Sequence, residues 1–189
     1  MSDDILTLLK ESGAFLEGHF LLTSGKHSNR YIEKFRLMES PEHLDKICQK
    51  MSAQFKSQSV DIVLGAAIGG ILLSSGVAKY LGKRGIFTER VKEKMELRRG
   101  FEIQEDSNVL IVEDIVSTGG SIFELIEVVK NYGANVAGVS SIVHRSVDEI
   151  NFGCPYKPLL NHPVESWSED SIPGWLNEIP ITVHGRSGK

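Results

Sequence analysis

The sequence has few cysteines and prolines and no excess of positive charge. Among 189 residues there are two cysteines, six prolines and a formal net charge of −4. Cys48 and Cys154 lie far apart and form no C-x-x-C motif, which argues against a disulfide framework or a zinc site and favours a reducing cytoplasm. The negative charge gives no bulk attraction to nucleic acid or to an anionic membrane.

A membrane-spanning run and a signal-like N-terminus are also missing. The first residues, "MSDDILTLLKESG", are acidic where a signal peptide is basic. Residues 62–78 carry no charge, but the run is shorter than the roughly 20 apolar residues of a spanning helix and is interrupted by glycines. We therefore expect a buried strand, turn and helix there instead of a membrane span.

Apolar periodicity predicts strands alternating with helices over most of the chain. A short helix is expected over 2–12, ended by Gly13, and a second one opens at Ser40 with Leu44, Ile47, Met51 and Phe55 on one face. The expected strands are 60–65, 85–89, 108–114 and 134–145, and the helices between them are 69–82 and 121–133. Continuous apolar strands in this order predict an α/β fold with a mostly parallel sheet flanked by helices on both faces.

Ligands of such sheets lie beyond the carboxyl ends of the strands. The segments that follow the strands should therefore meet at one edge. They are 65–70, 89–100, 113–121 and 144–146.

The most informative of these segments is "VLIVEDIVSTGGS", residues 109–121. Its turn is rich in glycine and hydroxyl groups and leads into a helix, whose first amides and dipole favour a phosphate. The sequence lacks the patterns G-x-x-x-x-G-K-[ST] and G-x-G-x-x-G, which excludes two common phosphate loops. Glu113 and Asp114 would repel a phosphate, so they are expected to face sugar hydroxyls of the same ligand; the alternative is that they only cap the strand and helix.

This pattern resembles the phosphoribosyl pyrophosphate (PRPP) loop of type I phosphoribosyltransferases. The resemblance implies that Glu113 and Asp114 hold the ribose hydroxyls and act in catalysis. It also implies a phosphate-binding turn made of Ile115, Val116, Ser117, Thr118, Gly119, Gly120 and Ser121. The fold implied is one phosphoribosyltransferase domain over 1–189, with a core at about 41–154 and a small hood from about 1–40 and 155–189.

The N-terminal stretch "GHFLLTSGKHSNRYIE", residues 18–33, resembles the signature of the orotate phosphoribosyltransferases. The resemblance implies orotate contacts from Ser24, Gly25, Ser117 and Arg145. Arginine suits the ring carboxylate of orotate because its planar fork binds carboxylates through two hydrogen bonds. The alternatives are an ordinary hairpin turn at Ser24 and Gly25 and a surface role for Arg145.

Two more segments resemble ligand loops of the family. "GAAIGG" resembles the diphosphate loop, with Ala67, Ile68, Gly69 and Gly70 as ligands, but it lacks the lysine that many relatives carry, so charge must come from elsewhere. The basic stretch 89–100 is expected to be a mobile loop that resembles the catalytic loop. Arg90 and Lys94 are its candidate catalytic and PRPP-binding residues; the alternative is a solvated surface.

The resemblance implies that PRPP and orotate react to give orotidine 5'-monophosphate and diphosphate in pyrimidine biosynthesis. It further implies Mg²⁺ held through PRPP with no direct protein ligand, and a homodimer whose catalytic loop reaches the neighbouring subunit. Two rival functions stay open, a purine or xanthine phosphoribosyltransferase and a non-catalytic PRPP-sensing regulator. His144 is expected to be structural, although it follows the same strand as Arg145, and the tail after Asn151 matches the family poorly.

Overall fold

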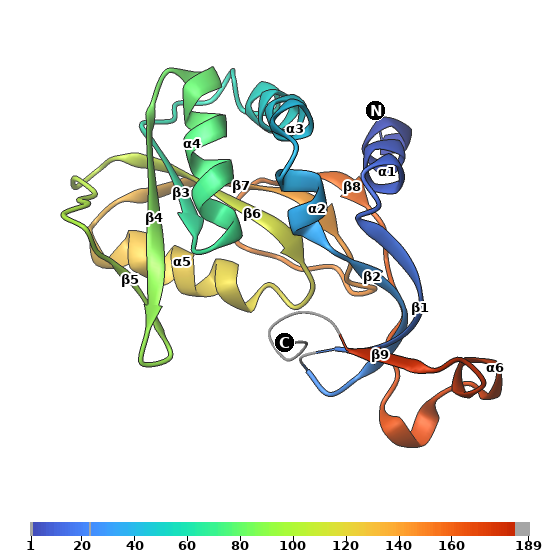
Figure 1. The fold of residues 1–189 in the computed structure, drawn as a ribbon. Helices are drawn as coiled ribbons and strands as arrows, with labels where there is room; N and C mark the ends of the chain where they lie inside the picture. Colours follow the sequence, from blue (N-terminus) through green and yellow to red (C-terminus); the bar gives the residue numbers. More distant parts are fainter. Residues whose placement is uncertain (1, 23, 184–189) are drawn as a thin grey trace.

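A six-stranded sheet forms the centre of the computed structural model, which describes residues 2–22 and 24–183 (Figure 1). The strand order is β5-β4-β3-β6-β7-β8, and every neighbouring pair is parallel except β4 with β5. The strands are β3 (Ile62–Ala66), β4 (Arg84–Val91), β5 (Lys94–Leu97), β6 (Asn108–Val116), β7 (Asn135–His144) and β8 (Tyr156–Asn161). The predicted α/β fold with a mostly parallel sheet is confirmed.

The central strand β6 shows why this sheet is covered on both faces. Its residues 109–112 are all completely buried. Leu110 and Val112 belong to one core cluster, whereas Val109 and Ile111 belong to the other. Successive strand residues point to opposite faces, so a continuous apolar run supplies two cores at once.

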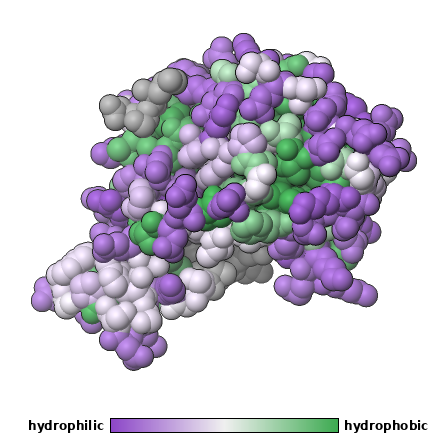
Figure 2. All heavy atoms as spheres, turned by 180° about the vertical axis from the view of Figure 1, so that it is seen from behind, coloured by the Kyte–Doolittle hydropathy of each residue, from purple (hydrophilic) through white to green (hydrophobic). Residues whose placement is uncertain are grey.

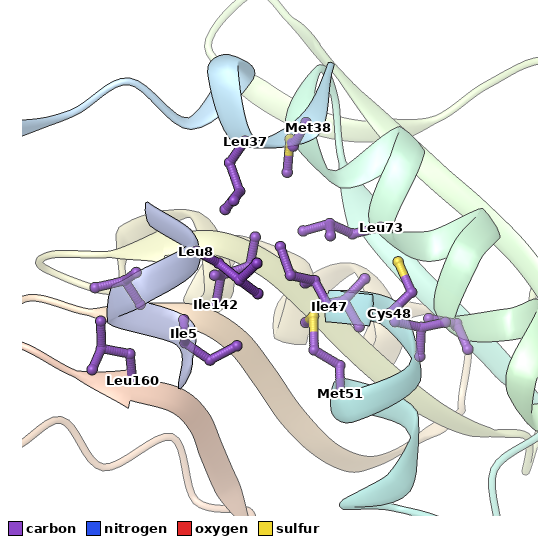
Figure 3. Close-up of a cluster of buried hydrophobic side chains, with 14 of the residues drawn as sticks. Ile5, Leu8, Leu37, Met38, Ile47, Cys48, Met51, Leu73, Ile142 and Leu160 are labelled. Carbon is purple, nitrogen blue, oxygen red and sulfur yellow. The ribbon is translucent and has the colours of Figure 1, made fainter. Parts of the chain in front are cut away.

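The first core lies between the sheet and the helices α1 (Ser2–Glu11), α2 (Lys34–Met38), α3 (Pro41–Ala53) and α4 (Gly69–Leu81) (Figure 3). Side chains from these four helices converge there with Ile142 of β7 and Leu160 of β8. The predicted inner face of α3 is confirmed, because Ile47 and Met51 are fully buried. The other face of the sheet is covered by α5 (Gly120–Asn131).

The helix ends follow the local chemistry of the sequence. Ser40 caps α3 by accepting a hydrogen bond from the His43 amide (3.4 Å). Gly82 adopts the left-handed conformation (φ 65°) directly after α4, as is common where a helix stops. Residues 62–78 form β3 and most of α4, as predicted, and among the described residues no helix is long and apolar enough to cross a membrane.

A second, three-stranded sheet is built from both ends of the chain. β1 (Phe15–Leu21) pairs antiparallel with β2 (His27–Ile32) and parallel with β9 (Ile181–Val183). The tail reaches this sheet through a 3₁₀ turn (Glu169–Ser171) and α6 (Gly174–Asn177) (Figure 1).

Strand β8, which we did not predict from the sequence, lies in the large sheet. Seen from behind, hydrophobic residues reach the surface in a band between hydrophilic regions (Figure 2).

The stretch 89–100, expected to be a mobile loop, is largely part of a β-hairpin instead. The chain forms an antiparallel hairpin of β4 and β5, in which Thr88 faces Leu97. Lys92 and Glu93 make the turn with positive φ values (44° and 70°), as in a two-residue type I′ hairpin. The last residue of β3 pairs with Thr88, so the hairpin extends beyond its neighbour β3. Its residues are therefore mostly charged and lack the apolar pattern from which strands are predicted.

Candidate functional site

The carboxyl ends of β3, β6 and β7 meet at one edge of the large sheet. The register pairs Gly65 of β3 with Val112 of β6, and Val116 of β6 with His144 of β7. The segments after these parallel strands therefore emerge side by side, as the sequence predicts. They are the loop 67–68, the turn 117–119 and the chain from Arg145 onward.

The turn after β6 forms a small pocket at the start of α5. Glu113 and residues 115–122 line it, and its volume is about 70 Å³, enough for several water-sized groups and therefore for one phosphate. The amide of Phe123 donates to the carbonyl of Gly119 (3.0 Å), so helix geometry leaves the preceding amides for a ligand. Gly119 has a φ of 78°, and a side chain there would meet the Phe152 ring at 2.8 Å. The sequence places glycine where no other residue fits.

The two acids at the end of β6 are buried and held by the backbone. Glu113 is 8% exposed and Asp114 is 3% exposed. Glu113 accepts a hydrogen bond from the Asp114 amide (3.0 Å), and Asp114 Oδ1 accepts one from the Ile115 amide (2.7 Å). Asp114 Oδ2 lies 2.5 Å from Lys34 Nζ, at the start of α2. Both carboxylates are therefore held in place at the carboxyl edge of the sheet. Acids that only capped the strand and the helix at the surface would be exposed to solvent.

Burial has a clear electrostatic consequence for Glu113. Desolvation, reinforced by the neighbouring charge of Asp114, raises the pKa of Glu113 to about 8. Glu113 therefore carries a proton near neutral pH and can donate as well as accept a hydrogen bond. A protonated Glu113 does not repel the neighbouring carboxylate of Asp114, which suits contact with neutral hydroxyl groups.

We expect Glu113→Gln to weaken the pH dependence of stability. Unfolded Glu113 loses its proton near its ordinary value of 4.5, whereas folded Glu113 keeps it to about 8. Between these values the native state binds more protons, so the free energy of unfolding falls as pH rises, by at most about 1.4 kcal/mol per pH unit. Glutamine removes this contribution, so the variant should gain stability over the wild type from pH 5 to pH 8. Urea denaturation at both pH values measures the difference; a constant difference would contradict the raised pKa.

The glycines of the loop after β3 allow it to approach the acid pair closely. A side chain on Gly69 would meet Asp114 Oδ2 at 1.9 Å, and one on Gly65 would meet the Gly70 carbonyl oxygen at 2.2 Å. The Ala67 amide already donates to the Thr88 carbonyl (2.8 Å), so the amides left for a ligand are those of 68–70. Ile68 is 69% exposed at the tip of the loop.

Arg145 directly follows β7, and its charge interacts with Tyr31 of β2 in the small sheet. Its amide extends the ladder by donating to the Val116 carbonyl (2.8 Å), and its side chain is half-buried. Burial lowers the pKa of its guanidinium. No carboxylate among residues 2–22 and 24–183 lies within 4 Å of this cation. A half-buried arginine costs less free energy when an anion neutralises it, so Arg145 is a candidate for contact with an anionic ligand.

Tyr31, at the end of β2, faces the same space. Burial raises the pKa of Tyr31, and the charges of Glu33, Lys34, Arg145 and Asp114 all act on it. The N-terminal segment therefore brings a phenol and an ammonium to the edge that carries Arg145 and the acids. Tyr31 lies in the stretch 18–33 that resembles the orotate signature, although no contact was predicted for it. Lys34 was not predicted, because only the tertiary fold brings it to Asp114.

The other residues singled out in the sequence make different contacts. Ser24 and Gly25 are exposed in the turn between β1 and β2, and among the described residues no hydrogen bond joins them to Arg145 or Ser117. Ser117 is exposed in the phosphate turn. His144 Nδ1 lies 3.1 Å from the Tyr156 hydroxyl, in keeping with a structural role.

The hairpin contacts α5 of its own chain. Arg90 donates two hydrogen bonds to the Glu124 carboxylate (2.8 and 3.0 Å), which raises the pKa of Arg90. Arg99 is paired with Glu89 (2.9 Å), whereas Lys94 is exposed. Arg90 must give up Glu124 before it can bind a substrate.

The donor groups fit a metal ion that arrives with a ligand. The described residues contain no cluster of three or more histidine, cysteine or acidic side chains that could hold an ion. Glu113 is protonated near neutral pH, and Asp114 is already paired with Lys34. The pair can contact the hydroxyls of a sugar that chelates a divalent cation.

Comparisons with known proteins agree with this geometry. Residues 36–152 match the family model described as the phosphoribosyl transferase domain. The chain is 46% identical over 183 residues to the orotate phosphoribosyltransferase of Desulforamulus reducens, covering 97% of this chain and 96% of the relative. It is 41% identical over 187 residues to that of Caldicellulosiruptor bescii, covering 99% and 98%. The solved orotate phosphoribosyltransferase of Aeropyrum pernix is similar with a TM-score of 0.64 and 25% identity, covering 83% of this chain and 93% of that one.

Proposed function

The chain belongs to the orotate phosphoribosyltransferases of the phosphoribosyl transferase domain family, and from this premise we propose that it transfers the phosphoribosyl group of PRPP to orotate. The products are orotidine 5'-monophosphate and diphosphate, a step of pyrimidine biosynthesis. The observation that carries the choice of base is Arg145, a half-buried cation with no carboxylate within 4 Å among the described residues. Orotate brings the missing carboxylate, whereas purine bases do not.

Three parts of the edge would hold PRPP. The turn from Ser117 to Ser121 and the start of α5 bind the 5-phosphate, which the pocket and the free amides support. Glu113 and Asp114 bind the ribose hydroxyls, and the loop 67–70 binds the diphosphate. The glycines let this loop approach Asp114 closely, which supports a diphosphate bound next to the ribose.

The reaction joins N1 of orotate to C1 of the ribose. The C1–O bond to diphosphate breaks with its electron pair going to the leaving oxygen, and the N1 proton is released. Positive charge develops on the ribose ring, where Asp114 lies, and negative charge develops on the diphosphate. Fixed groups aimed at developing charge stabilise such a transition state, and the buried carboxylate of Asp114 needs little reorganisation.

Mg²⁺ is proposed to bind through PRPP, with Asp114 and Glu113 contacting the chelated hydroxyls. When bound, it would neutralise charge on the leaving diphosphate. The state of the acid pair supports this arrangement, since Asp114 is ion-paired and Glu113 is protonated.

The remaining proposals concern assembly. The chain acts as a homodimer in the cytoplasm, and the hairpin carries Arg90 and Lys94 to the site of the neighbouring subunit. The projection of the hairpin beyond β3 supports this reach. Ser24 and Gly25, with the rest of the hood from 1–40 and 155–189, close over the base, and the core is 41–154.

A comparison of bases tests the proposed function. Purified protein with PRPP and Mg²⁺ should consume orotate, followed by its ultraviolet absorbance, and should leave adenine, guanine, hypoxanthine and xanthine unchanged. Turnover of a purine would assign another phosphoribosyltransferase activity. Binding of PRPP with no turnover of any base would indicate a regulator.

A further inference from the structure

The loop proposed to hold the diphosphate has no basic residue, but a lysine reaches it from another element. Lys34 is the first residue of α2, which lies beside the carboxyl end of β6 (Figure 1). Its Nζ lies 2.5 Å from Asp114 Oδ2 and 3.6 Å from the position that a Cβ on Gly69 would occupy. The ammonium group thus sits between the acid pair and the loop 67–70.

The partner of Lys34 is also the group that the ribose would need. Asp114 Oδ1 is used by the Ile115 amide, and Oδ2 is used by Lys34. Ribose hydroxyls that bind Asp114 compete for Oδ2 with the ammonium. Lys34 is still one-third exposed on a flexible four-carbon stem, so it can turn from the carboxylate without a movement of the backbone.

We infer that Lys34 is a diphosphate-binding residue, which neutralises Asp114 before PRPP arrives and turns onto a diphosphate oxygen beside Gly69 once the ribose hydroxyls replace it. This inference rests on the proposed function, because it takes PRPP as the ligand. Binding would exchange one ion pair of Lys34 for another, and Asp114 would exchange the ammonium for ribose hydroxyls, so the buried carboxylate keeps hydrogen-bond donors in both states.

Two other roles for Lys34 have different consequences. If Lys34 only anchored α2 to β6, its loss would lower stability and weaken every ligand alike. If it only kept Asp114 ready for hydroxyl groups, ligands with the same ribose would all weaken equally. A diphosphate contact alone separates PRPP from ribose 5-phosphate, which has the hydroxyls and the 5-phosphate but no diphosphate.

Calorimetric titration of PRPP and ribose 5-phosphate, both with Mg²⁺, tests the inference. Lys34→Met should weaken PRPP binding by about 10- to 100-fold, the effect of losing one charge-assisted hydrogen bond. Ribose 5-phosphate binding should not weaken, because this ligand has no diphosphate and because removal of Lys34 frees Asp114 Oδ2 for its hydroxyls. Lys34→Arg should recover most of the PRPP affinity, and Lys34→Gln replaces the methionine variant if that variant is unfolded at the assay temperature.

Lys50→Met is the matched control. Lys50 pairs with Asp4 at 2.7 Å and is 31% exposed, close to the 33% of Lys34. It lies in the last turn of α3, a helix that carries none of the proposed site residues. Lys50→Met should leave the affinities for PRPP and for ribose 5-phosphate unchanged. Equal weakening of the two ligands by Lys34→Met, or no weakening of PRPP, would overturn the inference. Because no base is present, the result decides on Lys34 even if the wild-type protein fails to consume orotate.

Discussion

Replacing Asp114 by asparagine should lower the rate of orotate turnover by about 10²- to 10³-fold, the loss typical of removing one preorganised electrostatic group. The amide keeps the shape of the side chain, so the contact with Gly69 is preserved. It loses the negative charge that faces the cationic ribose in the transition state. It also leaves Lys34 without its carboxylate partner.

The measurement is steady-state kinetics together with urea denaturation. The rate should fall far more than the free energy of unfolding changes, since burying an amide costs less than burying a charge. Asp45→Asn is the control, because Asp45 also accepts from a lysine, Lys79 at 3.1 Å, but lies on the exposed surface of α3. An Asp114→Asn enzyme with an unaltered rate would remove Asp114 from the reaction.

Much of the fold could be predicted because the strands of the large sheet are buried on both faces. Residues 109–112 and 62–64 have no polar side chain, so their apolar runs stand out in the sequence. The glycine turns could be predicted as well, since Gly82 and Gly119 adopt positive φ values that other residues avoid. Both signals are local, and a single sequence displays them directly.

The elements that could not be predicted depend on distant partners. β9 is three exposed residues that become a strand only by pairing with β1, more than a hundred residues earlier. The hairpin turn is Lys92-Glu93 and lacks the glycine or asparagine that usually marks such a turn. In β5 only Met95 and Leu97 contact the core, too few to display a clear alternation.

The candidate site also contains residues that could be predicted from the sequence and residues that only the fold brings together. Glu113, Asp114 and the turn after them lie in one continuous segment, so their proximity could be predicted from the sequence. Lys34 meets Asp114 only because α2 is placed beside β6, and no spacing along the chain encodes that contact. The raised pKa of Glu113 likewise depends on burial by the whole fold.

Arg145→Ala should lower kcat/KM for orotate by about 10²- to 10³-fold, within the range for truncating one partner of a buried hydrogen-bonded charge pair. The free protein offers Arg145 no carboxylate within 4 Å among its described residues, so the substitution should not destabilise the fold. PRPP affinity should stay within about threefold, because the phosphate turn and the acid pair are unchanged. Arg84→Ala is the control, because Arg84 is the first residue of β4, at the opposite end of the sheet. It should leave kcat/KM for orotate, the stability of the fold and the affinity for PRPP unchanged.

A second substrate separates recognition of the carboxylate from a general loss of activity. Uracil has the ring of orotate without its carboxylate, so the wild-type protein should use it far less efficiently. If Arg145 binds the carboxylate, Arg145→Ala should lower the rate with orotate but hardly change the slow rate with uracil, and the preference between the two bases should collapse. An equal loss with both bases would mean that Arg145 supports the architecture of the edge and that another group selects orotate. Because each rate is compared with the same variant, partial unfolding cancels, and the ratio reports only on the contact between the guanidinium and the carboxylate.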